Sequence, residues 1–389
     1  MKRSDDRILT THVGSLPRPD DLFELMLARM DGKPVDDTAY ATRVRQAVEE
    51  SVKQQAGAGL DVVSDGEMGK PSFITYASQR LAGLEKREGT RPSPFSNTRE
   101  TRDFPDYYQS QVAEQVSARR RRALMVCSGP IAYKGQTQLK ADLDTLKAAL
   151  KNVSTAEAFV PAIAPSNIEC TSPNEYYPSA EKYVFAIAEA MREEYRAIVD
   201  AGFLLQIDDP FLVTYYITQP DLSVAECRKW AELRVEALNH ALEGIPADRV
   251  RFHTCYSINM GPRIHDMQLK DIIDIVLKVK AQGYTFEAAN PRHEHEYEEW
   301  KRAKVPDDKI LLPGVITQST VLVEHPDLVA QRLVRFADVV GRERVIASAD
   351  CGFASFAGSN EVHPSIVWAK FSALVEGARL ASGQLWKQR

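Results

Sequence analysis

The sequence predicts an α/β fold of the (β/α)8 TIM-barrel class, formed as a single domain over residues 1–389 with a long loop insertion near residues 88–111. Short apolar runs alternate with helical stretches along the chain, and parallel strands that are buried on both faces appear as such continuous apolar runs. Almost every run ends in polar or reactive residues, as expected where barrel strands reach an active-site face. No solenoid-type repeat interrupts this order.

The elements follow in chain order. The first strand is RILTTHVGS, and a helix over 38–58 leads to the strand LDVVSDGE. The runs ALMVCSGP and AFVPAIAPS are the next strands, with a helix near 142–151 between them, and a helix over 180–201 precedes FLLQIDDP. Helices over 224–242 and 269–281 precede RVRFHTC and YTFEAAN, and KILLPGVI follows. A helix over 327–340, the strand RVIASADCG and a helix over 365–382 complete the pattern.

Composition narrows the class of protein. The chain of 389 residues is 44% hydrophobic and 26% charged, with a net charge of −5, which is typical of a globular protein and argues against nucleic acid as the main partner. No stretch approaches the roughly 18 apolar residues of a membrane span, and the N-terminus lacks the apolar region of a secretory signal. Five cysteines without paired spacing fit a reducing compartment. We therefore expect a cytoplasmic protein with no membrane partner.

Two segments carry soft metal ligands at predicted strand ends. His253 and Cys255 end one strand, Cys351 ends another, and Glu287 ends a strand between them. Two thiolates and an imidazole match the preferences of Zn²⁺, and Glu287 offers a fourth ligand. The wide spacing differs from the tight pairs of a zinc finger and suits a site assembled from several strand ends. The alternative is that these cysteines are small buried hydrophobic residues.

Other polar residues are predicted to converge on the same face. They are His12, Gly14 and Ser15 after the first strand, Asp65 and Glu67 after the second, Asp208 and Asp209 after FLLQI, and Gln318 after KILLPGVI. Acids next to a core are usually paired or functional. A functional role is favoured for Glu67 and Asp208, whereas function and packing are equally open for Asp209.

At these residues the chain resembles the catalytic barrel of the cobalamin-independent methionine synthase superfamily, including its single-domain branch with epoxyalkane:coenzyme M transferase. The motifs TTHVGSLPRP, DGE, QIDDP, HTC, FEAANPRHEHE, PGVI and DCG occur in the family's order and cover essentially the whole chain. Each motif alone is weakly specific, but together and in order they identify the family.

The resemblance implies a function for each matched position. Zinc would bind His253, Cys255, Glu287 and Cys351, and the segment from Val13 to Ser15 would hold the carboxylate of an amino-acid substrate. Glu67 and Asp208 would bind its ammonium group, with Asp65 beside them. We place His12, Asp209 and Tyr133 among the substrate-binding candidates. Tyr133, Tyr256 and His12 are also alternative proton donors to a leaving group.

Three departures from the family pattern concern the methyl donor. Asp208–Asp209–Pro210 replaces the usual Asp-Glu-Pro, and Gln318 lies near the position of a proton-passing histidine although its side chain cannot shuttle a proton. We keep Gln318 among the catalytic candidates. The tryptophan that stacks on the pterin is missing near SGPIAYKG, where Tyr133 is the nearest aromatic residue. The thiol-activating half of the site is therefore predicted to be intact, and the donor half to be changed.

The sequence thus predicts a zinc-dependent enzyme that transfers an alkyl group, most simply a methyl group, to a small-molecule thiol, as a 5-methyltetrahydropteroyltriglutamate–homocysteine methyltransferase does. The alternative activity is addition of a thiol to an epoxide. A non-catalytic zinc- or thiol-binding barrel and a metal-free decarboxylase-like barrel are two further hypotheses. The predicted partners are a thiol acceptor and an alkyl donor, while a homo-oligomer or a donor-delivering protein stays open.

Overall fold

A computed structural model describes residues 1–90, 95–109, 123–256, 261–358 and 362–386. Eight parallel strands form one sheet in the order β1-β10-β9-β8-β7-β6-β5-β2. Their bounds are β1 Leu9–Thr10, β2 Val62–Val63, β5 Glu157–Ile163, β6 Leu204–Asp208, β7 Val250–His253, β8 Gly283–Phe286, β9 Ile310–Ile316 and β10 Ile346–Ala349. The predicted (β/α)8 barrel is therefore confirmed.

The first and second strands bring the two edges of this sheet together. The backbone N–H of Asp61 donates to the carbonyl of Thr10 over 3.0 Å, and Thr11 Oγ1 donates to the carbonyl of Val62 over 2.9 Å. Asp61 Oδ2 also accepts from the N–H of Thr10 at 2.9 Å. Side chains thus assist the closure between two strands that are only two residues long.

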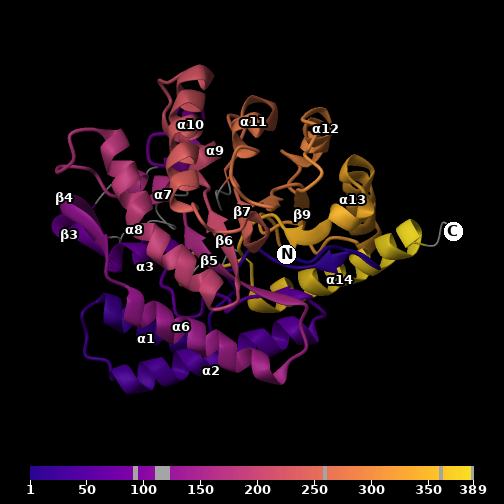
Figure 1. Cartoon of the computed structure of the whole chain (residues 1–389), viewed down its shortest axis with the longest axis horizontal. Coiled ribbons are helices and arrows are strands. Elements are labelled where there is room, and N and C mark those ends of the chain that lie inside the picture. Colours follow the sequence, from indigo (N-terminus) through magenta and orange to yellow (C-terminus); the bar gives the residue numbers. More distant parts are fainter. Residues whose placement is uncertain (91–94, 110–122, 257–260, 359–361, 387–389) are drawn as a thin grey trace.

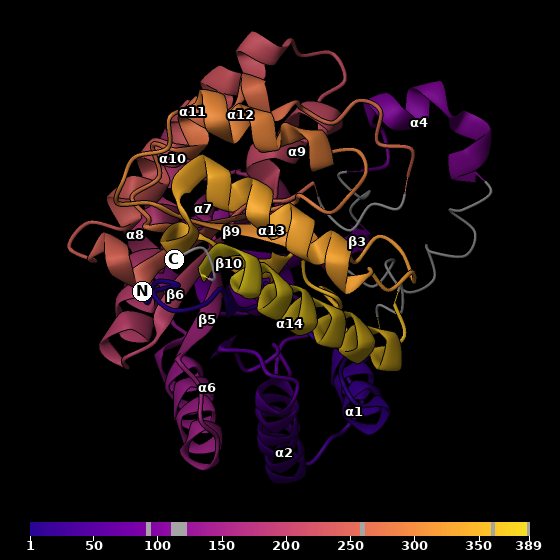
Figure 2. The same cartoon turned by 90° about the vertical axis from the view of Figure 1, so that its right-hand side faces the viewer.

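Helices surround the strands, as Figures 1 and 2 show. The longer ones are α1 Asp20–Met30, α2 Asp37–Gly57, α6 Gln136–Ala149, α8 Ala180–Asp200, α10 Val224–Ala241, α13 Pro326–Val340 and α14 Pro364–Trp386. The shorter ones are α3 Phe73–Gln79, α4 Arg99–Asp103, α7 Pro165–Thr171, α9 Phe211–Thr218, α11 Ile273–Val276 and α12 Tyr297–Arg302. Short 3₁₀ turns are Leu150–Asn152, Ala247–Arg249, Leu269–Asp271, Glu294–Glu296 and Arg342–Arg344.

The helix starts follow local side-chain chemistry. Ser179 caps α8 by accepting from the N–H of Lys182, and Ser223 and Glu226 form a reciprocal capping box at the start of α10. Each cap supplies acceptors for N–H groups that a helix cannot pair internally. The observed starts at Ala180 and Val224 match the predicted ones.

One predicted strand lies outside the barrel. The run ALMVCSGP belongs to β4 Ala123–Tyr133, which pairs antiparallel with β3 Leu81–Thr90 in a separate two-stranded sheet. This hairpin appears at the left edge of Figure 1. The chain had more apolar runs than a barrel has strands, and an apolar run alone does not say which sheet it joins.

The predicted insertion is confirmed, but its described part is not a plain loop. Residues 88–90 belong to β3, α4 covers Arg99–Asp103, and residues 105–109 are helical. Thr98 caps α4 in a capping box with Thr101. The remainder of the 88–111 segment lies outside the described residues.

A second difference concerns the predicted helix over 269–281. Only Leu269–Asp271 and Ile273–Val276 are helical there. The side chain of Asn239 donates to the carbonyl of Lys278 at 2.9 Å and accepts from the N–H of Lys280 at 2.8 Å. A partner on α10 therefore takes backbone groups that a continuing helix would need. Among the described residues, no helix is both long and apolar enough to cross a membrane.

Candidate metal and substrate site

Three of the four predicted metal ligands meet in the structure. His253 ends β7, Cys255 follows two residues later, and Cys351 lies just beyond the end of β10. One ligand atom from each lies within 4.8 Å of the others, and the two Sγ atoms are 3.2 Å apart. All three side chains are buried. The barrel therefore brings residues almost a hundred positions apart into one group of two sulfurs and an imidazole.

The chemistry of this group fits a zinc ion. Both ring nitrogens of His253 are buried, and no described residue gives either one a well-formed hydrogen bond. A buried polar atom without a partner is costly, and a metal ion would satisfy it. The nearby Cys351 thiol and burial raise the pKa of the Cys255 thiol well above its usual value. A cation between the sulfurs would remove that penalty and favour thiolates.

Glu287 does not belong to the three-residue group. It follows β8 directly, and its side chain is buried. Its Oε1 accepts from the N–H of Tyr256 at 2.8 Å, and its Oε2 pairs with Arg263 at 3.1 Å. The side chain of Asn290 donates to the same Oε2 at 3.0 Å. The carboxylate therefore already has partners on both oxygens.

His12 supports the turn that follows β1. Its Nδ1 accepts from the N–H of Gly14 at 3.2 Å, so Nε2 carries the proton in the hydrogen bond with Gln55 Oε1 at 2.8 Å. Burial lowers the pKa of His12 to about 3. Both nitrogens of the neutral ring thus have partners within the protein, and the geometry assigns His12 to holding Gly14 in place.

The turn from Val13 to Ser15 lies against the segment that carries Cys351. Gly14 has a φ of +137°, and a Cβ there would lie 2.7 Å from Pro161 Cγ, so only glycine fits this position. The carbonyl of Ser15 accepts from the N–H of Phe353 at 3.0 Å. Ser15 Oγ is so close to Gly352 that a Cβ on that glycine would lie 2.0 Å from it. The predicted carboxylate-binding turn therefore lies next to the predicted metal site.

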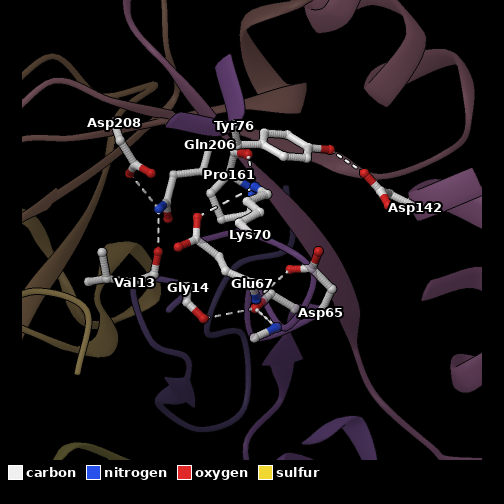
Figure 3. A network of polar contacts seen from close by, with 12 residues as sticks. Val13, Gly14, Asp65, Glu67, Lys70, Tyr76, Asp142, Pro161, Gln206 and Asp208 are labelled. Atoms are coloured by element: carbon white, nitrogen blue, oxygen red, sulfur yellow. Dashed lines mark hydrogen bonds and ion pairs between the residues drawn. The ribbon is translucent and has the colours of Figure 1, made fainter. Parts of the chain in front are cut away.

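Glu67 and Asp65 lie on the neighbouring turn, shown in Figure 3. Glu67 has a φ of +57°, a rare conformation for a non-glycine residue, and its N–H donates to Asp65 Oδ1 at 2.9 Å. The ammonium of Lys70 lies 3.4 Å from Glu67 Oε1 and donates to the carbonyl of Pro161 at 2.8 Å. Asp65 therefore shapes the turn, and Lys70 balances the charge of Glu67.

Asp208 is the second acid of this site. It ends β6 in register with His253 on β7, which places it beside a predicted metal ligand. The Gln206 amide donates to Asp208 Oδ1 at 2.7 Å and also to the carbonyl of Val13 (Figure 3). Burial and the charge of Glu67 together raise the pKa of Asp208 to about 7. The structure thus brings Glu67, Asp208 and the Val13–Ser15 turn together.

Asp209 has a different environment from Asp208. Its Oδ1 accepts from the Ser166 hydroxyl at 2.7 Å, the Asn167 amide at 3.1 Å and the N–H of Leu212 at 3.1 Å. Burial raises its pKa to about 7. These contacts join α7 to the first turn of α9. They support the packing interpretation that the sequence left open for Asp209.

Tyr133 and Gln318 occupy separate places. Tyr133 ends β4, and its ring lies 5.8 Å from the guanidinium of Arg80, which pairs with Glu194 at 2.6 Å. Gln318 follows β9 and is buried, and neither polar atom of its amide has a hydrogen bond within the described structure. The Gln318 amide is therefore a buried polar group whose donor and acceptor are both unused within the described residues.

Sequence reasoning missed several buried cations. Lys70 follows Glu67 by three residues, and Arg251 precedes His253 by two on the same face of β7. Arg251 donates to Thr11 Oγ1 at 3.0 Å and to the carbonyl of His12 at 2.8 Å. The two-residue strand period was a usable signal for Arg251. For Lys70, the signal was the charge of Glu67 three residues earlier, because a buried acid needs a partner of opposite charge.

Comparisons with known proteins agree with this architecture. A family model described as the catalytic domain of cobalamin-independent synthase matches residues 8–91 and 112–369. A methionine synthase of Thermococcus kodakarensis is 25% identical over 97% of this chain and 95% of its own length. One from Saccharolobus islandicus is 26% identical over 97% of this chain and 95% of its own length.

Solved structures show the same fold. A B12-independent methionine synthase from Shewanella, in complex with selenomethionine, superimposes with a TM-score of 0.71 at 19% identity, over 98% of this chain and 99% of that one. A putative vitamin-B12-independent methionine synthase from Listeria monocytogenes gives 0.67 at 20% identity, over 96% and 98%. Since the family model matches most of the barrel, the chain belongs to the cobalamin-independent synthase family and is an enzyme of the methyltransferase kind.

Proposed function

We propose that this chain is a zinc-dependent enzyme that transfers a methyl group to the sulfur of a small thiol amino acid of the homocysteine type. The observation that carries the proposal is the group of His253, Cys255 and Cys351, whose ligand atoms lie within 4.8 Å of one another beside the predicted substrate residues. A zinc ion held there would lower the pKa of a bound thiol and keep it nucleophilic at neutral pH.

The residues around this group would orient the acceptor. Because the N–H of Gly14 is already taken by His12, we assign the substrate carboxylate to Ser15. We assign the ammonium group to Glu67 and Asp208. The Lys70 ammonium beside Glu67 would set how strongly that acid attracts a second cation. Fixing both ends of the acceptor leaves its sulfur directed to the metal ligands, which is the main contribution of positioning to the rate.

We assign Gln318 to contact the alkyl donor. Its buried amide has both a donor and an acceptor to offer, and neither is used within the described residues. A glutamine cannot pass a proton, so this contact would bind and orient the donor without protonating a leaving group. This fits a donor other than the folate used with a proton-passing histidine.

Activity assays with purified protein test the proposal. L-homocysteine is offered with 5-methyltetrahydrofolate, methylcobalamin or a methylated small molecule, and methionine is measured. We expect methionine from at least one donor, lost after removal of metal by a chelator and restored by zinc. Cys351→Ser should abolish it, while Cys227→Ser, at a buried cysteine on α10 outside the group, should not.

The same assay, repeated with an epoxide as the electrophile and with the thiol adduct measured, separates the alternatives. If a thiol adduct forms only with an epoxide, the enzyme is a thiol–epoxide transferase. A protein that binds zinc but turns over none of these pairs is better described as a zinc- or thiol-binding barrel. Full activity of Cys351→Ser would contradict the proposed role of the metal.

A further inference from the structure

A buried cluster of charged side chains that includes Glu287 is not used by the proposed function. Its members are each less than 8% exposed, and they are Arg263, Asp266, Glu287, His293 and Glu296. The alternating charges in the sequence from His293 to Glu296 are typical of a solvated, charge-mixed surface. Burial of His293 and Glu296 shows that this interpretation is wrong for these two residues.

Arg263 is the centre of this cluster. Its Nε donates to Asp266 Oδ2 at 2.7 Å, and its Nη2 donates to Glu287 Oε2 at 3.1 Å. Its φ of +57° is a rare conformation for a side-chain-bearing residue, so the surrounding contacts must compensate a backbone cost. The guanidinium thus links two buried carboxylates from different segments of the chain.

Asp266 has a second partner, His293, besides Arg263. His293 contacts Asp266 Oδ2 through Nε2 at 3.0 Å and Glu296 Oε2 through Nδ1 at 2.8 Å. Burial alone would lower the pKa of His293, but the hydrogen bonds to Asp266 and Glu296 outweigh it and raise the pKa to about 9. The Tyr256 ring stacks on His293 with the ring centres 3.7 Å apart. The ion pair between Arg263 and Asp266 is therefore supported by a second charged pair, His293 and Glu296, and by the stacked Tyr256 ring.

Moving Glu287 away from Arg263 would be costly. Nη1 of Arg263 is buried and already lacks a partner among the described residues. Without Glu287, the buried guanidinium would keep only its bond to Asp266, and breaking a buried ion pair leaves an uncompensated charge. Glu287 would also give up the Tyr256 N–H and the Asn290 amide.

We propose that Arg263 is a positioning residue that holds Glu287 in an ion pair and away from the metal ligands. The group of His253, Cys255 and Cys351 then supplies three protein ligands, and the fourth position is left to the thiol. This inference rests on the proposed metal site, but it does not depend on which donor or acceptor is used. A site with three protein ligands and one exchangeable position is the usual arrangement of catalytic zinc.

A double-mutant cycle with cobalt(II) in place of zinc tests the inference. Four proteins are compared, namely the wild type, Glu287→Gln, Arg263→Met and the variant with both changes. The measurements are the visible spectrum of bound cobalt, the cobalt affinity by chelator competition, and binding of 2-mercaptoethanol through its sulfur-to-cobalt absorption band. Arg263→Lys, which keeps the cation, serves as the conservative control, and melting temperatures report folding.

We expect Glu287→Gln alone to leave the cobalt spectrum and affinity unchanged, because this carboxylate is not a ligand in the wild type. Arg263→Met should free Glu287 to bind the metal, which alters the spectrum and weakens 2-mercaptoethanol binding about tenfold or more. The second substitution should restore an open position and thiol binding. Arg263→Lys should resemble the wild type.

The inference is overturned if Glu287→Gln alone weakens cobalt binding about tenfold and changes the spectrum. It is also overturned if Arg263→Met folds and binds 2-mercaptoethanol as the wild type does. Failure of the wild type to bind cobalt would overturn the proposed function as well. If the cycle behaves as expected and no methyl transfer is found, only the proposed reaction falls.

Discussion

Neighbouring residues of this site have different tasks, and Asp208 and Asp209 are the clearest pair. Asp208 faces Gln206 and the charge of Glu67, whereas Asp209 accepts three hydrogen bonds from α7 and α9. The sequence favoured function for the first and left the second open. It could not decide because adjacent residues on a strand end point in different directions, and their partners come from distant segments.

We predict that alanine substitutions separate the two acids. Asp209→Ala should lower the free energy of unfolding by about 1–3 kcal/mol, because it leaves buried donors without their acceptor. Asp208→Ala should change stability by less, since the Gln206 amide still donates to Val13, and should raise the KM for the amino-acid thiol about ten- to hundredfold. Urea unfolding and steady-state kinetics measure the two effects, and the reverse assignment would contradict this account.

His12 gives a pH-dependent prediction. The folded protein leaves His12 neutral down to a pH of about 3, while in the unfolded chain it binds a proton below about pH 6.5. In this window the unfolded state holds one more proton, so the free energy of unfolding falls as the pH falls, by up to about 1.4 kcal/mol per pH unit.

The variant His12→Asn should lack this contribution. We expect a shallower loss of stability between pH 6.5 and 4 than in the wild type, measured by urea unfolding with a chelator present so that metal release does not contribute. The variant should also be less stable at neutral pH, because Gln55 Oε1 loses the ring N–H that His12 donates to it, which the shorter asparagine cannot replace. Equal pH slopes in both proteins would refute the assignment of His12 as a buried neutral residue.

At the scale of elements, the close approach of β9 and β10 positions the segment that carries Cys351 against the segment that follows β8. Asp350, next to Cys351, accepts from the N–H groups of Ala288 and Ala289 at 2.8 and 2.9 Å. Gly314 on β9 permits this arrangement, since a Cβ there would lie 2.2 Å from Asp350 Oδ1 and 2.5 Å from its Cα. Because Gly314 has no side chain, Asp350 can approach β9 closely and hold the backbone of the segment that follows β8.

We predict that Gly314→Ala is strongly destabilising. The added methyl group meets backbone that cannot move aside without separating the strands, so we expect a loss of about 3 kcal/mol or more. The matched control is Gly383→Ala on α14, where nothing lies within 4 Å of the added Cβ and a gain of about 0.5–1 kcal/mol is expected. Thermal unfolding of both variants checks this, and a neutral Gly314→Ala would contradict the described contact.

Element prediction failed where partners from other elements decide the outcome. The helix predicted over 269–281 is interrupted because Asn239 on α10 bonds to the backbone of Lys278 and Lys280. The run ALMVCSGP forms a hairpin because β3 supplies an antiparallel partner. Local periodicity contains neither piece of information.

At the scale of the whole molecule, the order of apolar runs and strand-end motifs predicted the barrel and its family. The motifs also predicted which segments meet, since the carboxyl ends of parallel strands share one mouth. The pairing within that mouth was not predictable. Glu287 is paired with Arg263, which comes from a connecting segment outside any strand, and His293 and Glu296 are buried in the same cluster of charged side chains.

The measurement that tests the central claim most directly is the zinc content of the purified protein, compared with Cys351→Ser and with Cys227→Ser as the control. X-ray absorption at the zinc edge is recorded before and after addition of L-homocysteine. We predict about one zinc per chain, lost only in Cys351→Ser, with an additional zinc–sulfur contact when the thiol is added. Absence of zinc from the wild type, or zinc that is retained in Cys351→Ser and does not respond to the thiol, would contradict the account.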